Sequence, residues 1–234
     1  MIYWTFKATA LTLLRLWLRP QVGGLDNVPA GPAIIVSNHL SFSDSFILGA
    51  VVSRRLTFLA KSAYFTAPGL KGWLMARFFR SLGQLALDRD SGRAAGAALE
   101  AAAAVLRRGG LLVIYPEGTR SPDGRLYRGR TGVARMVLAA GVPAVPVALV
   151  GTQRVQPPGT LWPRKAPVSI RIGAPLDFSG YAGAERQRGV LRAITDDIMT
   201  GLRELSGQEY VDSYSPGPHR DRVRAADTES ARKH

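Results

Sequence analysis

His39 stands apart from the other two histidines of the chain. It lies in the stretch SNHLSFSDS, whereas His219 and His234 lie in a charged C-terminal stretch that contains Pro and Gly. Asp44 follows it after a serine-rich spacer. A turn leading into a helix can bring the two side chains together, so that the carboxylate binds one imidazole nitrogen and leaves the other free as a base. The alternative is a loop histidine followed by Asp44 as a helix N-cap.

Two further clusters place arginine where an apolar strand is expected to end. Asp88 and Arg89 end the stretch GQLALDRD, and Glu117 and Arg120 lie in the stretch YPEGTRS, which follows the most apolar strand. Arginine beside Gly118, which permits close backbone approach, suits a phosphate or another dianion. For isolated loops, ordinary ion pairs of Arg89 with Asp88 and of Arg120 with Glu117 are the simpler interpretation.

The composition excludes several other chemistries. The sequence contains no cysteine, which excludes a disulfide framework, a thiol nucleophile and thiolate-bound zinc. It contains neither a GxGxxG dinucleotide loop nor a Walker sequence. A single imidazole and scattered carboxylates in the folded body make a poor zinc site. We therefore expect no metal ion and no other cofactor.

Short apolar runs predict the strands that would position these groups. Strands are expected at residues 33–36, 56–61, 84–87 and 111–115, and in the stretches PAVPVALVG and VSIRIG. Helical stretches separate them, among them residues 94–108, GVARMVLAA and residues 185–205. This alternation predicts an α/β fold with a single mixed, mainly parallel sheet covered by helices. In open α/β sheets ligands bind at the carboxyl ends of strands, which is where the polar clusters lie.

The chain divides into three parts. Residues 1–20 are an apolar, aromatic-rich stretch that ends at Pro20 and predicts a helix. Residues 21–205 contain the alternating strands and helices of the α/β domain. Residues 206–234 form a tail of mixed charge with few apolar side chains, which we expect to be disordered or loosely attached.

The N-terminal helix has the character of a membrane-associating segment. Nineteen helical residues would span about 28 Å, close to the thickness of a bilayer core. However, Lys7, Arg15 and Arg19 interrupt the apolar run, and a basic side chain at mid-bilayer costs roughly 2.5–3.5 kcal/mol. Trp4 and Trp17 suit the level of the lipid headgroups. We therefore expect a helix on the membrane surface, with packing on the protein's own core as the alternative.

The net charge favours anionic partners. It is +14, from 31 Lys and Arg against 17 Asp and Glu. The excess lies in the folded body, because basic and acidic residues balance in the tail from Ser206 onward. A basic body attracts nucleic acid, acidic lipid or phosphorylated ligands, and charge alone does not choose among them.

Four motifs in this order resemble the lysophospholipid acyltransferase family, and its bacterial 1-acylglycerol-3-phosphate acyltransferases in particular. The first is NHxxxxD, with Asn38, His39 and Asp44. The second runs from Gly83 to Arg89, with Ala86 where the family usually has an aromatic residue and Leu87 where it has Ile or Val. The third, EGTRS, is unaltered at residues 117–121, although Tyr115 replaces the common Phe. The fourth is VPAVPV at residues 142–147. The resemblance covers Val22 to about Ile172.

The resemblance implies a mechanism and roles for the motif residues. His39, oriented by Asp44, takes the proton from a free hydroxyl of a lysophospholipid, and the oxygen attacks the thioester of acyl-CoA or acyl carrier protein. Arg89 and Arg120 hold the phosphate of the acceptor. Glu117, Gly118 and Thr119 form the loop that carries Arg120, Asn38 shapes the site, and Lys61 lies near the phosphate pocket.

The resemblance also implies where the protein works. Its partners would be anionic membrane lipid, a lysophospholipid acceptor and the acyl-CoA or acyl carrier protein donor, and not nucleic acid. We expect a peripheral or monotopic protein on the cytoplasmic face of the cell membrane. The apolar region from Tyr64 to Phe79 would supply an acyl-chain tunnel or a second membrane contact, or would simply form part of the core.

Three alternatives stay open at the level of sequence. The altered second motif leaves room for the same chemistry on another lysolipid or on a glycolipid. A basic nucleic-acid-binding module would explain the charge, but neither an RNP sequence nor a recognition helix is recognisable. A catalytically inactive membrane-surface scaffold would explain the N-terminal helix, but not the histidine and aspartate motif.

Overall fold

A single sheet organises the protein. The computed structural model describes residues 2–61, 68–81, 84–87, 92–157, 160 and 162–216. Its main sheet has seven strands in the order β1-β8-β7-β2-β5-β3-β4. Their bounds are β1 (Gln21–Gly23), β2 (Ala33–Ser37), β3 (Leu56–Lys61), β4 (Leu85–Leu87), β5 (Leu111–Ile114), β7 (Ala144–Val150) and β8 (Ser169–Ile172). Neighbouring strands run parallel except β7 and β8, which confirms the predicted mixed, mainly parallel sheet.

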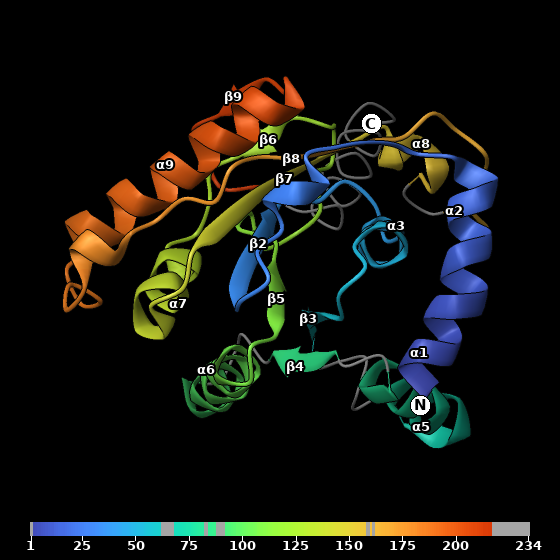
Figure 1. Ribbon diagram of the computed structural model, residues 1–234, viewed down its shortest axis with the longest axis horizontal. Helices are drawn as coiled ribbons and strands as arrows, with labels where there is room; N and C mark the ends of the chain where they lie inside the picture. Colours follow the sequence, from blue (N-terminus) through green and yellow to red (C-terminus); the bar gives the residue numbers. More distant parts are fainter. Residues whose placement is uncertain are drawn as a thin grey trace, which may run out of the picture.

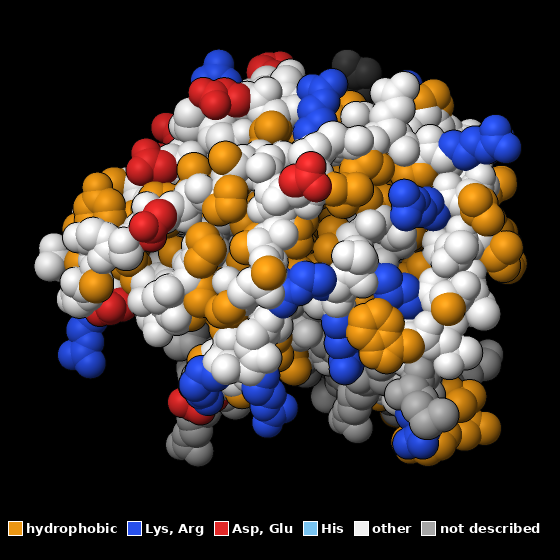
Figure 2. Space-filling view, viewed as in Figure 1, with side chains coloured by type: hydrophobic (Ala, Val, Ile, Leu, Met, Phe, Trp, Pro, Cys, Tyr) orange, Lys and Arg blue, Asp and Glu red, His pale blue; other side chains and the backbone are white. Residues whose placement is uncertain are grey.

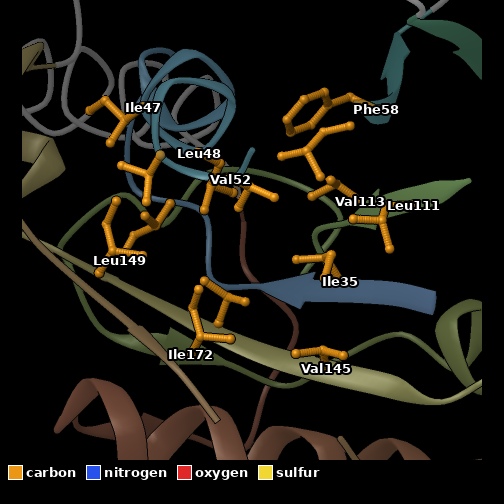
Figure 3. Packing of buried hydrophobic residues seen from close by; sticks show 14 of the residues in the cluster. Ile35, Ile47, Leu48, Val52, Phe58, Leu111, Val113, Val145, Leu149 and Ile172 are labelled. Atoms are coloured by element: carbon orange, nitrogen blue, oxygen red, sulfur yellow. The ribbon is translucent and has the colours of Figure 1, made fainter. Parts of the chain in front are cut away.

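Helices cover both faces of the sheet (Figure 1). The helices beyond the N-terminal segment are α3 (Asp44–Val51), α5 (Gly69–Ser81), α6 (Gly92–Arg107), α7 (Gly132–Ala140), α8 (Thr152–Val155) and α9 (Arg188–Ser206), and in Figure 1 α5 lies beside the start of the N-terminal segment. Adjacent residues of a strand point to opposite faces, so Ile34 packs with α6, α7 and α9 while Ile35 packs with α3. Figure 3 shows the second of these clusters, with Ile47 and Leu48 of α3 over the sheet. Burial on both faces explains why the central strands are continuous apolar runs.

The N-terminal segment is helical from Ile2 to Leu18. It consists of α1 (Ile2–Phe6), the π-helical turn η1 (Lys7–Leu11) and α2 (Thr12–Leu18), and it ends where Arg19 adopts a left-handed conformation before Pro20. Within the described part of the chain, no helix is both long and apolar enough to cross a membrane.

One side of this helix packs on the domain, as the core-packing alternative predicted. Tyr3, Leu11 and Leu18 are buried, and the Lys7 ammonium donates to the carbonyl oxygens of Val52 and Arg54. Burial also lowers the pKa of Lys7. Lys7 is therefore bound to the protein and does not face outward with Arg15 and Arg19.

The other side exposes large apolar side chains. Trp4, Leu13, Leu16 and Trp17 are exposed, with Leu13 at 66%. Figure 2 shows hydrophobic side chains over α2 and, below it, over α5. Exposed apolar patches of this kind mark contact sites.

The expectation of a loose tail from Ser206 is wrong for residues 207–216. After α9, Gly207 adopts a left-handed conformation, and β9 (Tyr210–Val211) pairs with β6 (Leu126–Tyr127) in a second, two-stranded sheet. The acidic side chains that suggested disorder form ion pairs: Glu209 lies 3.6 Å from Arg125, and Asp212 lies 3.5 Å from Arg128. Residues 217–234 lie outside the described residues.

Candidate active site

The predicted histidine and aspartate meet where β2 ends and α3 begins. His39 Nδ1 lies 2.8 Å from Asp44 Oδ2. The same carboxylate oxygen accepts the backbone N–H groups of Leu40 and Ser41, at 2.7 and 2.8 Å. Asp44 is fully buried, whereas the His39 side chain is 21% exposed. The carboxylate holds the proton on Nδ1 and leaves Nε2 as the basic nitrogen.

Tyr115 fixes the plane of the imidazole. The rings of His39 and Tyr115 are stacked, with centroids 3.9 Å apart and an interplanar angle of 12°. The Tyr115 hydroxyl lies 3.0 Å from Ser45 Oγ at the start of α3. Burial raises the pKa of Tyr115 well above its usual value, so the ring stays neutral beside Asp44. Sequence analysis noted Tyr115 only as a replacement for Phe. Tyr115 follows β5, which pairs with β2, and this position was the signal that could have placed its ring beside His39.

The EGTRS loop is fastened to the backbone of His39. Glu117 Oε1 accepts the His39 N–H at 3.1 Å, and its Oε2 accepts the Tyr127 N–H at 3.0 Å. The Ser121 N–H donates to the His39 carbonyl oxygen at 2.7 Å. Glu117 is fully buried, and burial raises its pKa from the usual 4.5 to about 7. Gly118 has a φ of 79°, which a side chain would oppose.

Arg120 remains available for a ligand. It is half-buried on the same loop, beside Thr119, which is also half-buried. Within the described part of the chain it forms no ion pair, so the predicted alternative of a pair with Glu117 does not occur there. Glu117 instead uses both oxygens on backbone amides.

Asn38 joins two strand ends. Its Nδ2 donates to the Leu149 carbonyl oxygen at 2.9 Å, and its Oδ1 accepts the Leu149 N–H at 2.7 Å. The side chain therefore ties the end of β2 to β7 and positions His39 through the backbone.

Comparison with known proteins identifies the family. A family model described as Acyltransferase matches residues 19–150. The chain belongs to the acyltransferase family. Its motifs, from His39 to the EGTRS loop, all fall within the matched residues.

Relatives of this acyltransferase chain are named for one activity. The 1-acyl-sn-glycerol-3-phosphate acyltransferase LPAT1 of Arabidopsis thaliana is 34% identical over 60% of this chain and 38% of its own length. A protein of the same activity from Pseudomonas aeruginosa is 28% identical over 72% of this chain and 63% of its own length. The chain spans only 38% and 40% of the lengths of LPAT1 and of a Brassica napus relative.

A solved structure shows the same fold. The crystal structure of the 1-acyl-sn-glycerophosphate acyltransferase PlsC from Thermotoga maritima superposes with a TM-score of 0.63 and 29% identity. The match covers 86% of this chain and 77% of the other. The α/β architecture is thus shared over nearly the whole described acyltransferase chain.

Gln208 is a site residue that sequence analysis missed. Its Oε1 accepts from Asn38 Nδ2 at 2.7 Å, and its Nε2 donates to the Gly124 carbonyl oxygen at 2.5 Å. It therefore links the histidine loop to the end of the EGTRS loop. It lies 170 residues from Asn38, in the stretch that was assigned to the tail, so no local pattern pointed to it.

For two predicted phosphate ligands, Lys61 and Arg89, only the position in the chain can be given. Lys61 is the last residue of β3, and Arg89 lies outside the described residues. Residues 144–147 of the VPAVPV stretch form the buried first half of β7, and the stretch carries no ionisable side chain. Among the described residues, no three His, Asp or Glu side chains gather as metal ligands would.

An apolar pocket lies near the His39 and Asp44 pair. It is a small pocket between the N-terminal helix, α3 and β3. Its lining includes Tyr3, Leu11, Phe46 and Phe58, and Ser45 lies at its wall. Because Ser45 contacts Tyr115 and Tyr115 stacks on His39, the pocket and the imidazole are neighbours.

Proposed function

We propose that the protein transfers a fatty acyl group from acyl-CoA or acyl carrier protein to the sn-2 hydroxyl of 1-acylglycerol-3-phosphate, forming phosphatidic acid. The observation that carries this proposal is the 2.8 Å contact between His39 Nδ1 and Asp44 beside a loop whose arginine has no acidic partner among the described residues. A base next to an anion site is what acylation of a phosphorylated alcohol requires. The activity for which the relatives are named supports the same choice.

The chemistry needs one proton carrier. His39 Nε2 takes the proton of the acceptor hydroxyl as its oxygen attacks the thioester carbonyl. When the tetrahedral intermediate collapses, the carbon–sulfur bond breaks and His39 returns the proton to the leaving thiolate. General-base help of this type is worth about 10²–10⁴-fold in rate. The Asp44 carboxylate stabilises the imidazolium that forms between the two steps.

The anion site would hold the phosphate of the acceptor. Arg120 supplies a fixed fork of N–H donors, which suits phosphate oxygens. Lys61 is proposed to complete the site from the end of β3, which pairs with β5, and Arg89 from beyond the end of β4, the next strand in the sheet. Glu117, Gly118 and Thr119 set the path of the loop.

The apolar pocket is proposed to hold an acyl chain. Its lining is mainly aromatic and aliphatic. Phe46 comes from α3, which follows the histidine loop, and Leu56 and Phe58 come from β3. Ser45 at its wall contacts Tyr115, which stacks on His39, so an acyl chain in the pocket would lie near the imidazole. The pocket is closed on one side by the N-terminal helix, so the helix would shape the acyl site as well as the surface.

The exposed apolar side chains support a peripheral position on the cytoplasmic face of the membrane. Trp4, Leu13, Leu16 and Trp17 share the outer side of the N-terminal helix, and Trp73 of α5 is also exposed. A surface helix with aromatic residues and arginines lies in the headgroup region of a bilayer. The acceptor and the product are both lipids, so the enzyme would meet them there.

A panel assay tests the activity. Purified full-length protein is incubated with acyl-CoA or acyl carrier protein and a series of lysolipids, and the products are identified by mass spectrometry. We expect phosphatidic acid from 1-acylglycerol-3-phosphate, and loss of product in the His39→Ala variant. If product forms only from another lysolipid, that lysolipid is the acceptor. This is the main competing hypothesis, because Ala86 and Leu87 in β4 depart from the family's second motif. Equal turnover by the parent and His39→Ala would refute the proposed base.

A further inference from the structure

A second exposed surface lies beside the active-site loop. Trp162 is 82% exposed, the highest value among the large hydrophobic side chains described, and Arg164 and Lys165 next to it are exposed. Pro163 and Pro167 stiffen the stretch. We refer to residues 162–167 as the Trp162 loop. The sequence analysis assigned it no role.

The Trp162 loop lies next to the C-terminal end of α2. The Gln21 N–H, three residues beyond α2, donates to the Val168 carbonyl oxygen at 2.9 Å. Leu18 of α2 belongs to the same core cluster as Val168, and Ala166 packs against that cluster. In Figure 1 the gold chain that follows α8 runs beside the end of α2. The loop therefore lies beside the C-terminal end of the N-terminal helix.

The same stretch is hydrogen-bonded to the histidine loop. Ser41 Oγ donates to the Gln156 carbonyl oxygen at 3.0 Å, and Ser43 Oγ donates to Gln156 Oε1 at 2.6 Å. The Arg164 N–H donates to the Val155 carbonyl oxygen at 2.7 Å, which returns the Trp162 loop to the base of α8. Any surface that binds the Trp162 loop is thereby placed beside His39.

The charge of this stretch selects an anionic partner. Residues 152–176 contain four basic side chains and no carboxylate, namely Arg154, Arg164, Lys165 and Arg171. Arg15 and Arg19 add positive charge at the end of α2. An exposed tryptophan beside basic side chains suits the headgroup level of an anionic bilayer, where the ring is partly desolvated and the charges meet lipid phosphates.

We infer that the Trp162 loop is a second membrane contact, specific for anionic lipid, which orients the active-site mouth toward the bilayer. This inference rests on the proposed membrane association and adds a site to it. The N-terminal helix supplies an apolar contact, and the Trp162 loop supplies an electrostatic one. A second contact beyond the end of the helix fixes the orientation of the protein on the bilayer, because it prevents the whole molecule from rolling about the axis of the N-terminal helix.

Vesicle sedimentation of the full-length protein tests the charge. Vesicles of phosphatidylcholine with and without phosphatidylglycerol are compared for the parent and for Arg164→Gln/Lys165→Gln. Each basic side chain near an anionic surface raises binding about fivefold, so the double variant should bind anionic vesicles about thirtyfold more weakly. Binding to neutral vesicles should be unchanged.

A matched control removes the same charge elsewhere. Arg186 and Arg188 are exposed at the start of α9, on the opposite side of the molecule (Figure 1). Arg186→Gln/Arg188→Gln should change binding about twofold or less, because salt screens charges far from the surface. Equal losses in the two double variants would overturn the inference. If the parent binds neither kind of vesicle, the proposed membrane association fails as well.

Fluorescence tests the position of the tryptophan directly. Replacing Trp4, Trp17 and Trp73 by Phe leaves Trp162 as the only tryptophan. Its emission should shift to shorter wavelength on anionic vesicles and be quenched by brominated phospholipid. A variant that sediments with vesicles but whose Trp162 emission is neither shifted nor quenched would show that the loop stays in water, and the inference would be wrong.

Discussion

The buried carboxyl group of Glu117 should make stability depend on pH in an unusual direction. Burial is the largest influence on this group and raises its pKa from 4.5 to about 7, although the amides of Tyr127 and His39 lower it. Between these two values the folded protein holds a proton that the unfolded chain has released. The free energy of unfolding therefore falls as the pH rises through this window, and it levels off above pH 7. Most carboxylates with hydrogen bonds have the opposite effect.

The size of the effect follows from the shift. Each pKa unit corresponds to 1.36 kcal/mol, so a change from 4.5 to about 7 corresponds to about 3 kcal/mol across the window. The Glu117→Gln variant keeps the shape of the side chain and does not titrate. In that variant the amide nitrogen faces one of the two N–H donors, which costs about 1–3 kcal/mol at every pH.

Urea unfolding at a series of pH values measures both the pH-dependent effect of the Glu117 carboxyl group and the constant cost of the lost hydrogen bond. The difference in unfolding free energy between the parent and Glu117→Gln cancels the titration of all other groups. This difference, parent minus variant, should fall by about 3 kcal/mol from pH 4.5 to 7. A difference for Glu117 that is flat, or that rises with pH, would show that the two amides outweigh burial and would refute the reasoning.

Four further predictions concern activity. Asp44→Asn should lower kcat by about 10²–10⁴-fold with little change in KM, because the carboxamide no longer fixes the tautomer of the base; an unchanged kcat contradicts this. Arg120→Ala should raise the KM for the lysolipid more than that for the thioester in steady-state assays, and the reverse would remove it from the phosphate site. Gln208→Ala should lower kcat. Gln208→Glu should restore little of it, because the carboxylate cannot donate to the Gly124 carbonyl oxygen. Equal rates in the parent and both variants would show that the contact between Gln208 and Gly124 is dispensable. Gly49→Leu should favour shorter acyl donors, since even a Cβ at Gly49 would lie 3.2 Å from Leu11, and an unchanged chain-length profile would place the acyl chain elsewhere.

The sequence predicted the parts of the site that depend on local pattern. The apolar run before His39 gave β2, and the polar spacer gave the turn that brings Asp44 back to the imidazole. It did not predict β6 and β9, because strands of two residues have no periodicity to detect. It also missed Gln208, since the partners of that side chain are set by the end of α9, far away in the chain.

The N-terminal helix shows why composition alone was ambiguous. A membrane-surface helix and a helix packed on the core are both predicted by the same apolar residues in 2–18. In the structure, some of these residues are buried on one side of the helix and others are exposed on the opposite side. Lys7 weighed against a membrane span, yet it is bonded to the carbonyl oxygens of Val52 and Arg54, whose positions no sequence pattern gave. The helix is therefore half core and half exposed apolar surface.

The position of His39 is fixed from four directions, and that arrangement decides how variants should combine. Asp44 holds the ring edge, Tyr115 holds the ring face, and the EGTRS loop holds the backbone through Glu117 and Ser121. Each of these contacts orients the same nitrogen, so losing one removes part of what the others provide. A Tyr115→Leu and Asp44→Asn pair should thus cost less in kcat than the sum of the single free-energy changes, because contacts that act on one group are not additive. Strict additivity would mean that the stacked ring and the carboxylate serve different steps.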